Sequence, residues 1–340
     1  MTKDATVPRP AGVEAVHGKK GVYFTDEEIR DLDPKLQSRI RHNSIPGPFG
    51  LKTQVVWLNV YLMVVLHVLW LWGAYVGTGA KWQSFVWYVI LGLGSGFGVT
   101  AGAHRLWTHR SYKAKLPLKI VLMCFDCLAM QNSVLVWSRD HRLHHKYTET
   151  DADPHNANRG FFFAHVGWLL MLKHPQVLIK GRNIDLEDLK QDPVVAFQAR
   201  FYLPLTILFS VLIPSLVPWY FWNEPGHIAF LFLFGFRYIT SLHCTWLVNS
   251  AAHLWGDRPY DRHSKTADNA FVCYAAVGEG FHNYHHAFPY DYSTGEWGPK
   301  LNMTTCFLDV FAALGLVYDR RQVSHEAILN MRKRKGDLSY

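Results

Sequence analysis

The sequence predicts an all-α membrane protein in which four transmembrane helices form two hairpins and carry a helical cap on one side of the membrane. Two observations lead to this fold class. Four apolar runs, each long enough for one bilayer crossing of about 20 residues, contain Arg237 as their single charged side chain. All but two of the 35 Lys and Arg residues lie outside these runs and their connecting turns. The excess of positive charge places the cap and both chain termini on the cytosolic side.

The runs define four spans joined in pairs by very short turns. They are predicted at 55–77, 84–103, 201–222 and 227–250. Arg237 lies inside the fourth span, where a charge is costly in lipid. We therefore expect it to face the protein interior and to serve a structural, hydrogen-bonding role.

The remaining segments are more polar. Residues 1–50 are rich in polar residues, Pro and Gly and predict a loosely ordered cytosolic arm, whereas 51–325 form the membrane domain. Residues 326–340 predict a basic, solvated tail. Two weaker apolar stretches, 117–130 and 160–172, are too short to span and are expected along the membrane interface or inside the cap.

Cysteines give no sign of a disulfide framework. The five cysteines have no paired spacing apart from the sequence CFDC at 124–127, which lies in an apolar stretch. We interpret that pair as buried and structural rather than as a redox or zinc motif.

Histidines carry the functional signal. Nine of the 19 histidines fall into short groups in or beside the predicted cap: His104, His109, His141, His144, His145, His253, His282, His285 and His286. Side chains three and four residues apart share one face of a helix. His141, His144 and His145 therefore present three imidazoles together, and so do His282, His285 and His286. His104 and His109 are five apart, and they converge only if the helix ends or bends between them, or if they reach one centre from different sides.

Such a gathering of imidazoles predicts metal binding. Buried ring nitrogens without partners would each cost about 1–3 kcal/mol, and ligation removes that cost. Nine ligands are too many for one ion, so two ions are expected, and imidazole suits Zn, Cu, Fe and Ni. A structural zinc site would use cysteine and stop at four ligands. For any of the other histidines, such as His67, His174 or His243, an ordinary core or surface role is expected.

The segments around these histidines resemble a known family. GAHRLWTHRSYKA (102–114), RDHRLHHKYTETDADPHN (139–156), NSAAHLWGDRPYD (249–261) and GEGFHNYHH (278–286) are similar to the histidine boxes of animal acyl-CoA Δ9 desaturases, the stearoyl-CoA desaturase family, and the likeness runs from about residue 50 to 325. The resemblance implies a di-iron centre. It assigns one iron to His104, His109, His141, His145 and His285. It assigns the other to His144, His253, His282 and His286, with Asn249 contributing through a water.

The resemblance also implies the reaction. It is the O2-dependent insertion of a double bond, cis Δ9 in the type family, into a long-chain saturated acyl-CoA. Electrons come from cytochrome b5 and its NADH-dependent reductase, in the endoplasmic reticulum membrane. An unactivated methylene requires a metal–oxygen oxidant, so no catalytic side chain is expected beyond the metal-bound set. The net charge of +8 suits membrane lipid and an acidic partner, and no nucleic-acid partner is expected.

Substrate contacts follow from the same likeness, which places the CoA and acyl-chain contacts at Asn59, Asn132, Arg139, Asp140, Lys173 and Trp246. Two departures stand out. The family has a basic residue where this chain has Leu172, so part of the CoA-phosphate contact is either missing or supplied by another cation, such as Lys180 or Arg182. The family also tends to carry a bulky residue within 91–98, which is LGLGSGFG here. These glycines are either close-packing sites or the wall of a deeper tunnel that accepts longer chains.

Three alternatives remain at this stage. Relatives with the same boxes cut at positions other than Δ9, so the regiochemistry is open, as is the preferred chain length. A membrane hydroxylase or sterol oxidase would use the same metal chemistry, but the residues between the histidines favour the acyl-CoA desaturase type. A metal transporter or sensor would place its ligands along a path inside the spans, whereas these histidines gather in the cytosolic segments.

Overall fold

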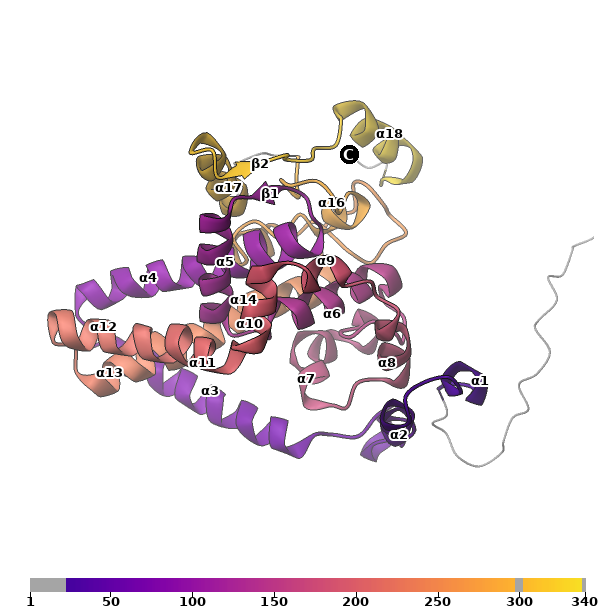
Figure 1. The fold of residues 1–340 in the computed structure, drawn as a ribbon, viewed down its shortest axis with the longest axis horizontal. Helices are drawn as coiled ribbons and strands as arrows, with labels where there is room; N and C mark the ends of the chain where they lie inside the picture. Colours follow the sequence, from indigo (N-terminus) through magenta and orange to yellow (C-terminus); the bar gives the residue numbers. More distant parts are fainter. Residues whose placement is uncertain (1–22, 297–301, 338–340) are drawn as a thin grey trace, which may run out of the picture.

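The computed structural model describes residues 23–296 and 302–337. Its four longest helical stretches are Trp57–Gly77, Trp82–Thr108, Tyr202–Trp222 and Gly226–Leu254. In Figure 1 they extend together toward the left, and most of the shorter helices gather at their other end. Each is long and apolar enough to cross a membrane. This confirms the predicted all-α membrane fold with two helical hairpins.

Three of the four spans contain a π-helical segment. The spans consist of α3 (Trp57–Gly77); α4 (Trp82–Phe97) with η2 (Gly98–Thr108); α11 (Tyr202–Thr206), η5 (Ile207–Leu212) and α12 (Ile213–Trp222); and α13 (Gly226–Phe230), η6 (Leu231–Phe236) and α14 (Arg237–Leu254). The second span continues beyond its predicted end at 103 because all of η2 is buried against the cap. Packing against the cap stabilises η2, although this segment is less hydrophobic than the rest of the span.

The outer faces of the spans are apolar and exposed. Trp57 and Tyr75 on α3 and Leu203 on α11 are each at least two-thirds exposed. A continuous apolar surface of this extent is unfavourable in water and marks contact with a membrane. The chain is therefore a multi-pass membrane protein.

The turn ends of the two hairpins are tied together. Glu224, in the second turn, is buried and accepts hydrogen bonds from the backbone N–H of Lys81 at 3.0 Å and from the hydroxyl of Ser84. The Lys81 ammonium donates to the carbonyl oxygens of Trp222 at 2.7 Å and Asn223 at 2.8 Å. We call this set of contacts the turn clasp.

The cap is built from short helices. In chain order its elements are α1 (Asp26–Ile29), α2 (Pro34–Asn43), η1 (Pro48–Gly50), β1 (Lys113–Ala114), α5 (Leu116–Ala129), α6 (Val134–Tyr147), η3 (Ala157–Arg159), η4 (Phe163–Gly167), α7 (Trp168–Leu170), α8 (Pro175–Arg182), α9 (Glu187–Lys190), α10 (Pro193–Arg200), α15 (Ala270–Ala275), α16 (His282–Ala287), α17 (Met303–Ala313), β2 (Val317–Tyr318) and α18 (His325–Lys335). Strands β1 and β2 pair antiparallel, with Lys113 opposite Tyr318. The main hydrophobic core joins η2, α5, α10 and α17 through Leu106, Leu122, Val195 and Leu308.

Helices α5 and α6 meet at an angle of 81°. Between them Met130 and Asn132 adopt positive φ angles of 52° and 76°. Along α5, Leu122 is fully buried, whereas Leu116 and Ile120 are about half exposed. One face of α5 is therefore buried in the core of the cap and the other is apolar and exposed, so the structure is compatible with both predicted places for 117–130, the membrane interface and the cap.

Both ends of the described chain are more ordered than the sequence suggested. Residues 1–22 of the predicted arm and 338–340 of the predicted tail lie outside the described residues. In the described part of the arm, Ile29 and Ile40 are buried against Ile179 of α8, so the loosely ordered interpretation is wrong there. In the described part of the tail, the basic residues Lys333, Arg334 and Lys335 are exposed, but the segment forms the helix α18, which packs Ile328 beside Tyr260.

Candidate metal centre and adjoining cavities

The nine singled-out histidines reach one place from four elements. η2 and the residue after it supply two, α6 supplies three, the last turn of α14 supplies one and α16 supplies three. α6 starts at the N-cap Ser133, whose hydroxyl accepts from the Val136 N–H. α16 starts where the Asp268 carboxylate accepts the N–H groups of Asn283 at 2.8 Å and Tyr284 at 3.2 Å. Polar caps therefore set where the two histidine-rich helices begin.

The π-helical turn explains how His104 and His109 converge. The backbone N–H of His109 donates to the carbonyl oxygen of His104 at 3.0 Å. This i→i+5 hydrogen bond is that of a π-helix, which brings residues five apart onto one side. The rings lie 4.8 Å apart between centroids. The expected irregularity is thus a π turn at the end of the helix.

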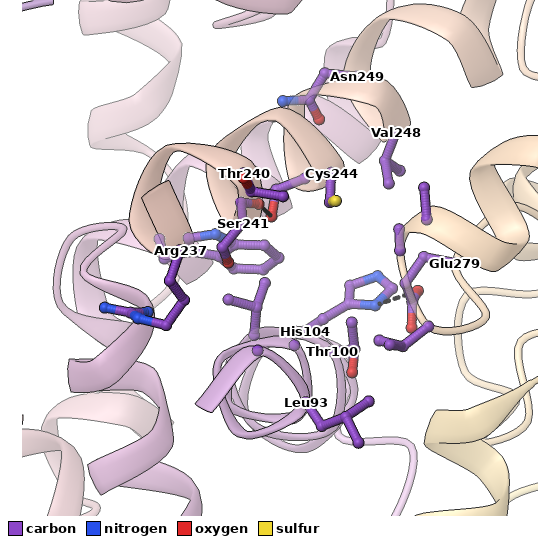
Figure 2. A pocket seen from close by; sticks show the side chains of 18 of the residues that line it. Leu93, Thr100, His104, Arg237, Thr240, Ser241, Cys244, Val248, Asn249 and Glu279 are labelled. Carbon is purple, nitrogen blue, oxygen red and sulfur yellow. Dashed lines mark hydrogen bonds and ion pairs between the residues drawn. The ribbon is translucent and has the colours of Figure 1, made fainter. Parts of the chain in front are cut away.

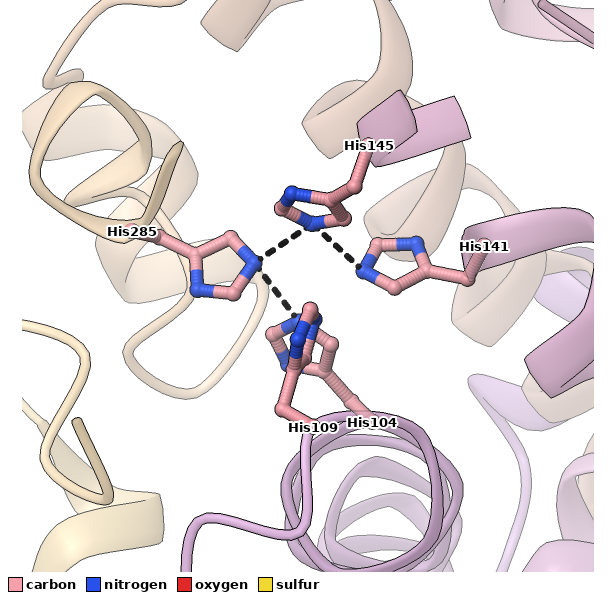
Figure 3. Close-up of side chains that lie close together, drawn as sticks. All are labelled: His104, His109, His141, His145 and His285. Carbon is pink, nitrogen blue, oxygen red and sulfur yellow. Dashed lines mark hydrogen bonds between the residues drawn. The ribbon is translucent and has the colours of Figure 1, made fainter. Parts of the chain in front are cut away.

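Five histidines form the first group, which we call the five-histidine group (Figure 3). It comprises His104, His109, His141, His145 and His285, with one ring nitrogen of each within 4.8 Å of the others. The Nε2 atom of His285 lies 3.0 Å from that of His104 and 2.9 Å from that of His145. The Nε2 atoms of His145 and His141 are 3.1 Å apart.

Four histidines form the second group, the four-histidine group. It comprises His144, His253, His282 and His286, again with ring nitrogens within 4.8 Å of one another. The Nε2 separations are 2.9 Å for His282–His253, 3.2 Å for His286–His282 and 3.3 Å for His144–His286. The two groups are neighbours, because the rings of His145 and His286 stack at 4.2 Å.

The geometry and protonation of both groups suit metal ions. Nitrogens at right angles around an ion with bonds of about 2.1 Å stand about 3.0 Å apart, and the observed separations are close to that value. Burial, reinforced by neighbouring imidazoles, holds the pKa values of the histidines outside the spans well below the usual range, as at His109, His141, His144, His145, His282, His285 and His286. These seven rings therefore favour the neutral form, which keeps a lone pair for a metal. The buried Nε2 atom of His109 has no hydrogen-bond partner among the described residues, as expected of a ligand atom.

Buried carboxylates contact the outer nitrogens of three of these rings, and sequence reasoning missed them. Glu279 lies 2.9 Å from His104 Nδ1 and also binds the buried guanidinium of Arg105 at 2.7 Å. Burial alone would raise the pKa of Glu279, but Arg105 and then His104 outweigh it and lower the pKa to about 2. The signal available in the sequence was an acidic residue a few positions from a histidine box, as in GEGFH and DADPH.

An apolar cavity of about 300 Å³, the inner cavity, extends from the metal centre into the spans. Figure 2 shows Leu93 and Thr100 on one side, the α14 residues Thr240, Ser241 and Cys244 on the other, and His104 at one end. Gly92 and Gly96 also line the cavity.

The glycine-rich stretch serves two purposes. A Cβ atom at Gly92 would meet no atom within 4 Å, whereas one at Gly98 would lie 2.2 Å from the carbonyl carbon of Phe125. At Gly94 it would come within 3.3 Å of the Phe125 ring. Gly94 and Gly98 thus allow close packing against α5, and Gly92 opens the cavity wall.

A second cavity of about 290 Å³, the outer cavity, also reaches His141 of the five-histidine group. The two cavities share four lining residues, namely Trp137, His141, Thr245 and Asn249. They therefore adjoin beside the five-histidine group. Asn249 lies one helical turn before His253, so the two side chains share one face of α14.

The six expected substrate contacts are not all in one place. Asn132, Asp140 and Trp246 line the outer cavity. Arg139 and Lys173 do not line it, but both form ion pairs with Asp140, at 2.7 Å and 2.5 Å. The amide of Asn59 donates to the carbonyl oxygen of Leu169 at 2.8 Å. Polar and charged groups therefore collect at the outer end, away from the inner cavity.

Arg237 faces the protein interior as expected. It is buried and donates to Ser95 Oγ at 2.9 Å, to the Leu128 carbonyl at 3.2 Å and to Ser210 Oγ at 3.0 Å. Its guanidinium thereby joins three elements, α4, α5 and η5. No carboxylate forms an ion pair with it within the described chain.

The other histidines are engaged elsewhere. His165 Nε2 lies 3.0 Å from His243 Nδ1, and the ring of His67 lies 5.3 Å from that of His243. His155 is buried beside the outer cavity. Burial, with a contribution from His144 that exceeds the opposing effect of Asp153, lowers the pKa of His155 to about 3.

The chain is similar to known proteins over most of its length. The sequence model of the fatty acid desaturase family matches residues 80–293. An acyl-CoA desaturase of Cyprinus carpio is 54% identical over 289 residues, which cover 85% of this chain and 88% of the relative. The stearoyl-CoA desaturase of Homo sapiens is 52% identical, with 94% and 88% covered. An acyl-CoA Delta-9 desaturase of Acheta domesticus is 51% identical, with 94% and 90% covered.

Proposed function

Because this chain belongs to the fatty acid desaturase family, we propose that it inserts a double bond into a long-chain saturated acyl-CoA. The observation that carries the proposal is the position of two converging histidine groups between an apolar cavity and a cavity with charged groups at its outer end. An acyl chain in the inner cavity would place its middle methylenes beside His104 and His141. The charged end of the same molecule would lie near Asp140.

The metal would be a pair of irons. The five-histidine group would hold one and the four-histidine group the other, with Asn249 contributing through a water. When bound, the two irons supply the dioxygen chemistry that removes two hydrogens from adjacent methylenes. The overall reaction consumes one O2, two electrons and two protons, and it releases two waters. The two electrons would come one at a time from cytochrome b5, reduced by its NADH-dependent reductase.

The protein's own side chains would orient the substrate and exclude water. Trp137 and Thr245, which line both cavities, would confine the chain where it passes the metal centre. The half-buried cations Arg139 and Lys173 share a single carboxylate, Asp140. One positive charge is thus left over for a CoA phosphate.

Lys52 is a further candidate, beside Lys180 and Arg182, for the cation missing at Leu172. The segment before α3 pairs with the segment around Leu172: the N–H of Leu172 donates to the Gln54 carbonyl at 2.9 Å, and Thr53 Oγ1 donates to the Leu172 carbonyl at 2.8 Å. This pairing brings Lys52 beside Leu172, where it binds Asp151 at 2.5 Å. Lys180 instead faces Glu28 of the N-terminal arm at 3.8 Å.

The open wall at Gly92 favours long acyl chains. A bulky side chain at this position would occupy the inner cavity, and glycine leaves that volume to the ligand. We propose that stearoyl-CoA or a longer acyl-CoA is accepted at least as well as palmitoyl-CoA. The position and geometry of the new double bond are proposed as cis Δ9.

The site of action would be the endoplasmic reticulum membrane. The positive charges outside the spans favour a cytosolic location for the cap and both termini. Acyl-CoA and cytochrome b5 would then approach the cap from the cytosol. The distribution of positive charge outside the spans is what supports this orientation.

Expression in a yeast strain that lacks its own Δ9 desaturase tests the function. The wild-type chain should restore growth without added unsaturated fatty acid, and mapping of double bonds should find cis Δ9 octadecenoate. His141→Ala should abolish product, whereas His263→Ala, at an exposed histidine outside both groups, should not. Hydroxylated fatty acids, or full activity of His141→Ala, would contradict the proposal.

A further inference from the structure

The proposed ligands leave a problem of charge. All nine are histidines, which bind a metal as neutral imidazoles, and most of them are buried. Two divalent ions would bring four positive charges into this region. Buried charge is costly unless opposite charge lies nearby. The compensation must come from groups beyond the direct ligands.

Three carboxylates contact the nitrogen of a ligand histidine that points away from its group. Glu279 Oε2 lies 2.9 Å from His104 Nδ1, and Asp153 Oδ1 lies 3.0 Å from His144 Nδ1. Glu149 Oε1 lies 3.5 Å from His253 Nδ1. In each case the Nε2 atom of the histidine faces the rest of its group. A proton held on Nδ1 by the carboxylate fixes the tautomer whose Nε2 lone pair is free for metal.

The two groups differ in how these carboxylates are balanced. Glu279, beside the five-histidine group, is already paired with Arg105. Asp153 and Glu149, beside the four-histidine group, have no lysine or arginine ion pair among the residues that the structure describes. The Asp153 side chain is almost fully buried, and it accepts the backbone N–H groups of Glu149 at 2.8 Å and His155 at 3.1 Å. Two negative charges therefore stand next to one group without a cation.

We propose that Glu279, Asp153 and Glu149 are positioning residues for the metal centre, and that Asp153 and Glu149 make the four-histidine group the stronger metal site. The inference rests on the proposed metal loading of the two groups. The missing cation beside these two carboxylates is the ion bound by His144 and His253. The two ions are consequently inequivalent, and the ion in the five-histidine group leaves first when metal is removed.

Anaerobic titration of the metal-free, full-length protein with Fe²⁺ tests the proposal. Wild type should bind two ions in two resolved steps. Asp153→Asn keeps an oxygen that accepts the His144 N–H but removes the charge, so the tighter step should weaken about 10- to 100-fold. The Mössbauer spectrum of the iron-loaded variant should lose mainly one of two signals.

Asp291→Asn is the matched control. Asp291 is an equally buried carboxylate without an ion pair among the described residues, and it accepts from Tyr284 and Ser293 rather than from a histidine. This variant should bind iron as wild type does. Equal weakening in both variants would show a merely structural effect and overturn the proposal, as would wild-type affinity in Asp153→Asn.

Failure of the proposed metal loading has a different signature, because wild type would then take up no iron, whichever carboxylate is changed. Failure of the desaturase function alone would appear in the yeast assay as hydroxylated or absent product and would leave the two iron-binding steps unchanged. Glu279→Gln is less suited to the test, because it leaves the buried Arg105 without its partner. Its loss of folding would report on that ion pair rather than on the metal.

Discussion

The inner and outer cavities have nearly the same volume, about 300 Å³ and 290 Å³, but their walls differ in kind. The inner cavity runs between transmembrane helices and is mostly apolar at Gly92 and Leu93, although Arg237 and Glu279 also line it. The outer cavity has a larger polar share, to which Asn132 and Asp140 contribute, among aromatic and aliphatic residues. If one ligand fills both cavities, the inner cavity would discriminate by chain length and the outer cavity by charge. The metal centre lies beside the junction of the two cavities.

The largest effect is expected from a substitution that blocks the inner cavity. Gly92→Trp should lower kcat/KM for stearoyl-CoA by about 100-fold, since the indole fills space that several methylenes would occupy and each methylene is worth about 1–3 kcal/mol. The fold should tolerate the change because the added Cβ meets no atom within 4 Å. The measurement is a comparison of stearoyl-CoA with lauroyl-CoA, whose shorter chain should be much less affected.

A glycine two turns further along separates blocking from misfolding. Gly98→Ala should reduce folded protein without changing chain-length preference, because its Cβ would lie 2.2 Å from the Phe125 carbonyl carbon. Unchanged stearoyl-CoA turnover in Gly92→Trp would show that the acyl chain does not enter the inner cavity.

An intermediate effect is expected from removing a positive charge near the outer cavity. Lys173→Gln should raise KM for stearoyl-CoA about 10-fold with little change in kcat, because it removes a binding charge remote from the reacting carbons. The matched control is Lys180→Gln, whose ammonium faces Glu28. A stearoyl-pantetheine thioester, which lacks the adenosine phosphates, should show the same KM with both variants and wild type. A fall in kcat at constant KM would place Lys173 in another role.

The smallest effect concerns pH and His155, beside the outer cavity. Its pKa falls from an ordinary value near 6.5 to about 3 on folding. In the unfolded chain His155 therefore binds a proton below about pH 6.5, whereas in the folded chain it does so only below about pH 3. The free energy of unfolding falls as the pH drops through this window. At pH 5.5 this one group should cost about 1 kcal/mol.

Thermal unfolding of wild type and His155→Gln at pH 7.5 and 5.5 measures that contribution. The decrease in melting temperature on acidification should be a few degrees smaller in the variant. Equal decreases in both proteins would show that His155 is not kept neutral by burial.

Sequence patterns predicted the spans and the nine histidines because both are local signals. A run without charges, or imidazoles three and four residues apart, needs no knowledge of distant contacts. The helix ending at Thr108 was out of reach because buried packing, not hydropathy, sustains η2. The split role of Gly92 and Gly98 likewise depends on which glycine faces Phe125.

The carboxylates around the metal centre illustrate the same limit. Asp153 lies nine positions from His144 and Glu279 lies 175 positions from His104. Their contacts depend on how α6, η2 and the segment before α16 pack together. Likewise, the pairing of the segment before α3 with the region of Leu172 is a tertiary feature, so Lys180 and Arg182 could be named as candidate substitutes from the sequence, whereas Lys52 could not.

The turn clasp has a consequence for how a product leaves. Glu224, Lys81 and Ser84 fasten the far ends of the two hairpins, so the helices resist splaying at that end of the molecule. A product chain in the inner cavity would then have to withdraw past the histidine groups instead of passing through the membrane side. A bent unsaturated chain would pass Trp137 and Thr245 on its way out less easily than a flexible saturated chain passes them on its way in. Departure of product, rather than hydrogen removal, would then govern turnover.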